Sequence, residues 1–130
     1  MNTSYFANFK YIKNPVSISQ GPPWWYGGAQ YKVLAPAWEL IKRAHHGYLT
    51  EHEYRLLYIE SILVKLNPQE VYAYLLTEYG ENCTLLCFED LKHPGDYCHR
   101  RIVAQWFEDS LGIEIPELKP PSKMRSTLSW

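Results

Sequence analysis

The run Cys83–Phe88 constrains the fold more than any other stretch of this sequence. Its six residues, CTLLCF, are apolar apart from Thr84, and polar residues flank the run on both sides. A uniformly apolar run of this length fits a central strand that is buried on both faces, as strands of parallel sheets are. The sequence therefore predicts a sheet whose centre is covered on both sides.

Helices are predicted ahead of this strand, with recognisable start and stop signals. Thr50 and Glu53 form a T-x-x-E capping box, and Asn67 is an N-cap that precedes a proline. Gly47 and Gly80 stand where two of the helices should end. The predicted helices are Pro36–His46, Tyr54–Lys65 and Pro68–Tyr79.

Further elements complete the pattern. Thr3–Phe9 is predicted as the first strand, Val16–Ser19 as a brief strand, and Ile113–Ile115 as a final short strand. Between Tyr97 and Leu111 the apolar residues have helical spacing. Strands separated by helices favour a three-layer α/β domain with a small, mainly parallel sheet. We expect one domain over residues 1–115 and a proline-rich tail over 116–130.

Composition limits the classes of function. Of the 130 residues 46% are hydrophobic, and the formal net charge is −1, so we expect no strong non-specific binding to nucleic acid. No apolar run approaches the roughly 20 residues that span a bilayer, so we expect no membrane partner. The start of the chain lacks a signal-peptide pattern, which predicts a cytoplasmic protein with reduced cysteines.

The segment 87–101, CFEDLKHPGDYCHRR, links the apolar strand to the last helix. Ligands of open α/β sheets bind beyond the carboxyl ends of the strands, which places this segment at the expected site. The helix start and Arg100 both favour an anion. His99 is a candidate proton shuttle, Cys98 a nucleophile or a packed thiol, and Glu89 a general acid or base or an ion-pair partner.

Two other interpretations of the cysteines are less favoured. Cys87, Cys98 and His99, with His93 as a possible fourth, are ligand types that zinc prefers. However, there is no C-x-x-C pair, and neighbours on one helix turn point in different directions. A Cys87–Cys98 disulfide is disfavoured in a reducing compartment. We therefore expect no metal and no cofactor.

An aromatic loop follows the first strand, within Asn14–Gly28. Trp25 and Tyr26 are predicted either to stack on a planar ligand or to fold over the core. Ser17 and Ser19 are candidate hydroxyl donors beside them. From the first strand, Tyr5 and Asn8 are expected to supply polar contacts.

Several of these motifs together resemble the family known as domain of unknown function 488. The resemblance runs from about Thr3 to Ile115 and rests on five short stretches. These are Thr3–Asn8, Pro15–Ser19 with Gly21, Trp25-Tyr26, Leu85–Glu89 and Cys98–Arg100. It implies a compact Rossmann-like α/β fold of bacteria or their phages, without an established reaction. The recurrent residues of the family match Ser4, Asn8, Cys87, Glu89, Cys98, His99 and Arg100.

These observations predict a pocket for a phosphorylated planar, nucleotide-like molecule. An enzyme of this kind would cleave or transfer at a glycosidic or phosphate linkage, using Glu89, His99 and Cys98. A non-catalytic sensor or a phage-encoded sponge would only capture a nucleotide signal. A protein-interaction module using Trp24, Trp25 and the tail is the weakest alternative. The aromatic-rich helices also make a homo-oligomer plausible.

Overall fold

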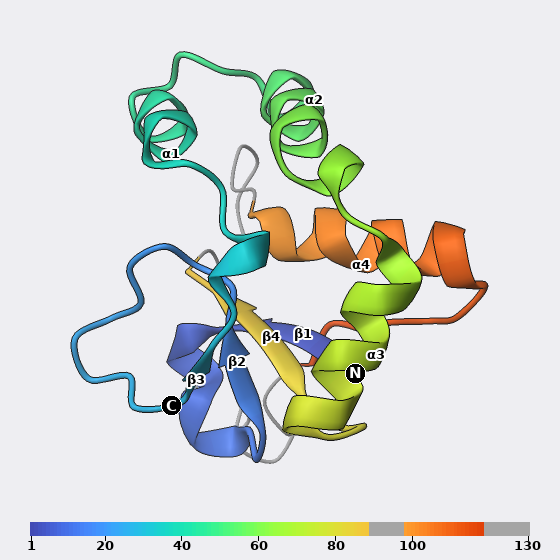
Figure 1. The fold of residues 1–130 in the computed structure, drawn as a ribbon. Helices are drawn as coiled ribbons and strands as arrows, with labels where there is room; N and C mark the ends of the chain where they lie inside the picture. Colours follow the sequence, from blue (N-terminus) through green and yellow to red (C-terminus); the bar gives the residue numbers. More distant parts are fainter. Residues whose placement is uncertain (89–97, 119–130) are drawn as a thin grey trace, which may run out of the picture.

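The computed structural model describes residues 1–88 and 98–118, and it is a mixed α/β domain (Figure 1). The strands are β1 (Asn2–Tyr5), β2 (Pro15–Ser17), β3 (Ala29–Gln30) and β4 (Thr84–Cys87). The α-helices are α1 (Trp38–His45), α2 (Glu51–Ser61), α3 (Pro68–Tyr79) and α4 (His99–Leu111). Three 3-10 helices lie between them: η1 (Phe6–Tyr11), η2 (Lys32–Leu34) and η3 (Leu63–Lys65).

All pairings in the four-stranded sheet are parallel, in the order β1-β4-β2-β3. The predicted central strand is confirmed, because β4 lies between two neighbours and all four of its residues are buried. Successive side chains of a strand point to opposite faces of the sheet, so a strand that is covered on both faces needs apolar residues throughout. Leu85 belongs to the larger core with the helices, while Leu86 belongs to a smaller core on the other side.

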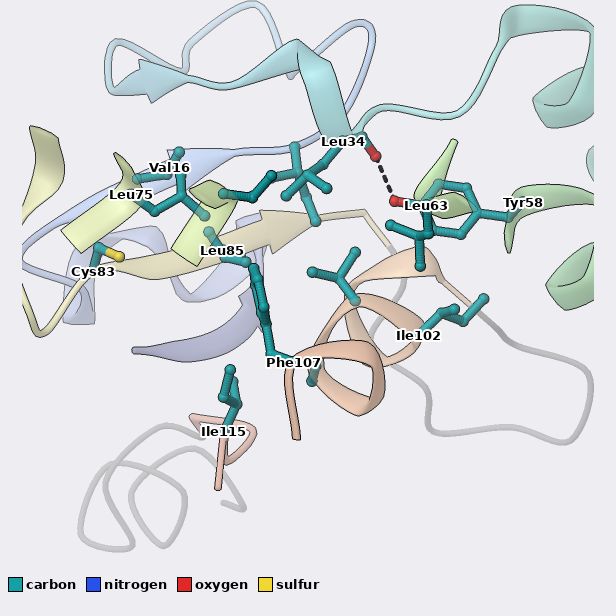
Figure 2. Packing of buried hydrophobic residues seen from close by; sticks show 14 of the residues in the cluster. Val16, Leu34, Tyr58, Leu63, Leu75, Cys83, Leu85, Ile102, Phe107 and Ile115 are labelled. Carbon is teal, nitrogen blue, oxygen red and sulfur yellow. Dashed lines mark hydrogen bonds between the residues drawn. The ribbon is translucent and has the colours of Figure 1, made fainter. Parts of the chain in front are cut away.

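The larger core holds residues of α2, α3 and α4 against the sheet (Figure 2). Within this core the Tyr58 hydroxyl donates a hydrogen bond to the Leu34 carbonyl oxygen at 2.7 Å. Phe6, Ile12 and Tyr26 cover the opposite face beside Leu86. The three layers are therefore the helices, the parallel sheet, and η1 with the aromatic loop, which confirms the Rossmann-like expectation.

The first strand is shorter than predicted. It ends at Tyr5, and residues 6–11 form η1 instead of continuing to Phe9. A 3-10 helix has three residues per turn, which brings Phe6 and Phe9 to one side. Both rings contact Trp25 and Tyr26. Packing against this distant loop overrides the strand-like local pattern.

Other boundaries differ for identifiable reasons. The capping box at Thr50 is confirmed, and α2 begins directly after it at Glu51, not at Tyr54. Helix α1 starts at Trp38, because Ala37 still has extended backbone angles. The predicted strand Ile113–Ile115 is wrong: only Glu117 forms a bridge, with Thr3. The short β3, beside β2, was not predicted, and it begins directly after the segment Asn14–Gly28.

Residues 116–118, assigned to the tail by sequence, contact the sheet. Thr3 N donates to the Pro116 carbonyl oxygen at 3.0 Å, and Leu118 N donates to the Thr3 carbonyl oxygen at 2.6 Å. Within residues 1–88 and 98–118, we find no helix with the length and apolarity needed to cross a membrane.

Candidate functional site

A cavity of about 630 Å³ lies at the carboxyl ends of β2 and β4, as expected for an open parallel sheet. The sheet side and the start of α4 contribute Ser19, Gln20, Gly21, Cys87, Phe88, Cys98 and His99. Helices α1 and α2, which lie as a pair above the start of α4 in Figure 1, contribute the opposite wall. Together with the residues that flank them, they supply Pro36, Trp38, Ile41, Ala44, His45, Gly47, Leu49, Thr50, Glu51 and Tyr54.

Cys87, Cys98 and His99 come together at the floor of this cavity. The sulfur atoms of Cys87 and Cys98 are joined as a disulfide, with their Cα atoms 6.7 Å apart. Cys98 Sγ also lies 3.7 Å from His99 Nδ1. We expected neighbours in the first helical turn to point apart, and this was wrong. Cys98 is the N-cap with extended backbone angles, so its side chain turns back toward the ring of His99.

His99 is buried, and its Nε2 lies 2.6 Å from the Ile18 carbonyl oxygen. A carbonyl oxygen can only accept, so Nε2 carries the proton, and Nδ1 of the neutral ring is unprotonated. Burial lowers the pKa of His99 to about 4; the Ile18 hydrogen bond opposes this, and the Arg100 charge adds to it. His99 is thus neutral at pH 7, and it presents an acceptor to Cys98 rather than an acidic proton.

Arg100 does not line the cavity, although we predicted that it would hold an anion there. Its side chain is fully buried, and its Nε and one terminal nitrogen donate hydrogen bonds to the Glu117 carboxylate at 3.0 and 2.7 Å. The other terminal nitrogen donates to Cys87 Sγ at 3.2 Å. The carboxylate that binds Arg100 therefore comes from the chain itself, from the segment next to β1.

The predicted first-strand residues belong to the same side as this ion pair. Ser4 Oγ donates to the Leu118 carbonyl oxygen at 2.8 Å and accepts from Asn8 at 3.0 Å. The Arg100 guanidinium lies 5.8 Å from the ring centre of Tyr5. These three residues do not line the cavity, and the Ser4 hydrogen bond joins Leu118 to β1.

The aromatic loop packs against the sheet and does not line the cavity. The Tyr26 hydroxyl donates to the Ala29 carbonyl oxygen at 2.6 Å and accepts from Ser17 N at 3.1 Å. Burial is the main reason that the pKa of Tyr26 rises to about 12. Trp25 packs on Phe6 and Phe9, while Trp24 is 95% exposed. Of the two predicted serines, Ser19 lines the cavity, and Ser17 Oγ accepts from Ser19 N at 3.2 Å.

The aromatic residues of the cavity wall were missed by sequence reasoning. Trp38 begins α1 and is 55% exposed, and Tyr54, predicted only as part of a helix, is buried in α2. His45, near the end of the predicted helix Pro36–His46, also lines the cavity. A usable signal was the placement of three α-helices, α1, α2 and α3, between β3 and β4, because this connection must pass the carboxyl edge of the sheet. Glu89 and His93 lie outside the described residues.

The fold and this cavity define a small Rossmann-like α/β protein with a ligand-sized site at the carboxyl edge of its sheet. Within that class, residues 14–111 match DUF488-N3a, described as the active DUF488-N3 subclade. The chain therefore belongs to the DUF488 family, as stretches such as Leu85–Glu89 and Cys98–Arg100 indicated. Neither the curated proteins nor the solved structures contain a match to this chain.

Proposed function

We propose that this protein binds a small planar molecule, of nucleoside or nucleotide type, in the cavity between the sheet edge and helices α1 and α2. The observation that carries the proposal is the cavity itself. At about 630 Å³ it lies in the range of small-molecule sites. Trp38, Tyr54 and Phe88 supply ring surface on its wall. Planar bases stack on such aromatic side chains.

The chemistry of the wall sharpens the proposed ligand class. Among the described lining residues there is no Lys or Arg, and Glu51 adds a carboxylate. Arg100 is buried and bound to Glu117, so the proposal does not use it to hold a phosphate. The ring and sugar of a nucleotide-like ligand, rather than its phosphate, are therefore the parts that this wall fits.

The floor of the cavity favours a reactive role over simple capture. Cys98 and His99 place a sulfur atom and an unprotonated ring nitrogen at the end of an otherwise largely apolar pocket. A nucleophile beside a base is the arrangement that covalent catalysis uses, and here it would serve the proposed attack at a glycosidic or phosphate linkage. We propose that the protein acts in the cytoplasm, where the cysteine pair is reduced, on a nucleoside-like substrate.

The test is binding to a panel of nucleosides and mono-, di- and cyclic nucleotides, measured by native mass spectrometry. Trp38→Ala removes ring surface from the wall, and we expect a loss of roughly 5- to 100-fold in affinity. Trp24→Ala is the matched control, because Trp24 is 95% exposed and does not line the cavity. The mass of the bound species separates the two roles, since an enzyme releases cleaved fragments and a sequestering protein keeps its ligand intact.

Equal affinity in both tryptophan variants would place the ligand elsewhere. No binding of any panel member by the wild type would overturn the proposed ligand class.

A further inference from the structure

The side chains at the floor of the cavity can also bind a metal ion. Cys87, Cys98 and His99 are all buried, and one potential ligand atom of each lies within 4.8 Å of the others. They come from two separate elements, the end of β4 and the start of α4. Two cysteines and a histidine are the ligand types that zinc and other soft divalent metals prefer.

The orientation of His99 fits a metal ligand. Its Nε2 donates to the Ile18 carbonyl oxygen at 2.6 Å, which leaves Nδ1 with a free lone pair on the side of Cys98. Histidine ligands of zinc nearly always donate their other ring N–H to a carbonyl or carboxylate in this way. The ring is thus held in the tautomer and orientation that a metal requires.

The distances also fit. A tetrahedral zinc ion, with Zn–S near 2.3 Å and Zn–N near 2.0 Å, separates a sulfur and a nitrogen ligand by about 3.5 Å. Cys98 Sγ and His99 Nδ1 are 3.7 Å apart. The sulfurs of Cys87 and Cys98 are bonded here, and their Cα atoms, 6.7 Å apart, are at the wide end of the spacing of bonded cysteines. Once the S–S bond is reduced, side-chain rotation can therefore move the two sulfurs apart around an ion.

Charges around the group balance a bound ion. A divalent cation with two thiolates and a neutral imidazole carries no net charge, so its burial costs little. Beside it, Arg100 donates to Cys87 Sγ at 3.2 Å and is itself paired with Glu117. A guanidinium hydrogen bond of this kind stabilises a thiolate that is bound to a metal.

We propose that Cys87 Sγ, Cys98 Sγ and His99 Nδ1 form a zinc site in the reduced protein. Three protein ligands leave a fourth position, which faces the cavity because all three residues line it. Sites with three protein ligands and one open position are typical of zinc that activates water or a substrate. This site goes beyond the proposed ligand pocket and does not depend on it. While zinc is bound, Cys98 and His99 act as its ligands and not as nucleophile and base.

The metal and the disulfide exclude each other. Oxidation of the two thiols forms one S–S bond and gives up two electrons and two protons to an oxidant such as diamide, which becomes a hydrazine. Zinc binding instead displaces the two thiol protons and forms two Zn–S bonds. The disulfide in the structure is the oxidised form of the same pair, so oxidation is expected to release the metal.

The test begins with the full chain, reduced with a phosphine under nitrogen and freed of metal by a chelator. Zinc is added, the excess is removed, and the zinc content is measured by inductively coupled plasma mass spectrometry. We expect one zinc ion per chain for the wild type and for Cys83→Ala, the matched control, because Cys83 lies outside the group. Loss of an outer-shell partner already weakens metal binding 10- to 100-fold, so Cys87→Ser and Cys98→Ser should weaken it at least about tenfold.

Two further measurements need no variant of the site. Wild type oxidised with diamide should retain no zinc. Cobalt added to the reduced wild type should show the thiolate-to-cobalt charge-transfer band of a tetrahedral site. Reduced wild type without stoichiometric zinc, or cobalt without that band, would overturn the proposal, and so would equal zinc content in Cys98→Ser. Trp38→Ala should bind zinc normally, so failure here is distinct from failure of the ligand pocket.

Discussion

Two polar regions lie on opposite sides of Cys87, and they differ in whether their side chains face a cavity or bind other residues of the chain. On one side lies the cavity floor, where Cys98 and His99 face open space at the carboxyl edge of the sheet. On the other side Arg100, Glu117 and Thr3 bind one another beside β1. Among the described residues no buried side-chain nitrogen or oxygen lacks a hydrogen-bond partner.

The difference shows that a buried cation at a helix start is not by itself a ligand site. Arg100 has the residue type and helix position of an anion-binding group, but Glu117 supplies the anion from the same chain. No single residue type at the cavity floor points to a ligand as strongly as Arg100 does. The floor's side chains nevertheless face a space that can hold another molecule. We expect substitutions on the first side to alter stability and those on the second to alter binding.

The largest effect is expected from Glu117→Ala. It leaves the fully buried Arg100 without the carboxylate that grips it, and breaking a buried pair from one side costs about 3 kcal/mol or more. The measurement is the free energy of unfolding in urea, followed by circular dichroism. Glu114→Ala is the control, because this exposed residue should change stability by less than about 0.5 kcal/mol. Similar losses in both variants would show that the ion pair contributes nothing.

The second effect is a pH dependence centred on His99 in the metal-free protein. Its pKa is about 4 in the folded state, below the roughly 6.5 of an unfolded chain, so between these values the unfolded state binds more protons. Stability is therefore full above pH 6.5 and falls as the pH is lowered toward 4, by about 3 kcal/mol in all. Urea titrations between pH 7 and 5, before most carboxylates titrate, measure the upper part of this fall. His99→Asn should flatten it, and an unchanged slope in that variant would contradict the assignment.

The smallest effect compares two helix caps. The Thr50 hydroxyl accepts from Glu53 N at the start of α2 beside the cavity, while Asn67 accepts from Glu70 N at the start of α3. Replacing either cap by alanine should cost about 1 kcal/mol of stability. Only Thr50 lines the cavity, so only Thr50→Ala should also weaken nucleoside binding. If Asn67→Ala weakened binding as much, the effect would come from global stability.

Much of the fold follows from local signals in the sequence. The run of apolar residues in β4, the capping box at Thr50 and the Asn67 cap each act within a few residues, and all three are confirmed. The failures are elements whose shape depends on distant contacts. Residues 6–11 form η1 because Phe6 and Phe9 pack on a loop nearly twenty residues away.

The candidate site divides in the same way. The sequence alone determined that Cys87, Cys98 and His99 would lie at the carboxyl edge of a parallel sheet, because strand polarity and helix order decide which residues emerge there. Only the tertiary structure decided that Glu117 would bind Arg100 and that Trp38 and Tyr54 would line the cavity. Those contacts join residues far apart along the chain, and side-chain packing, rather than any local pattern, brings them together.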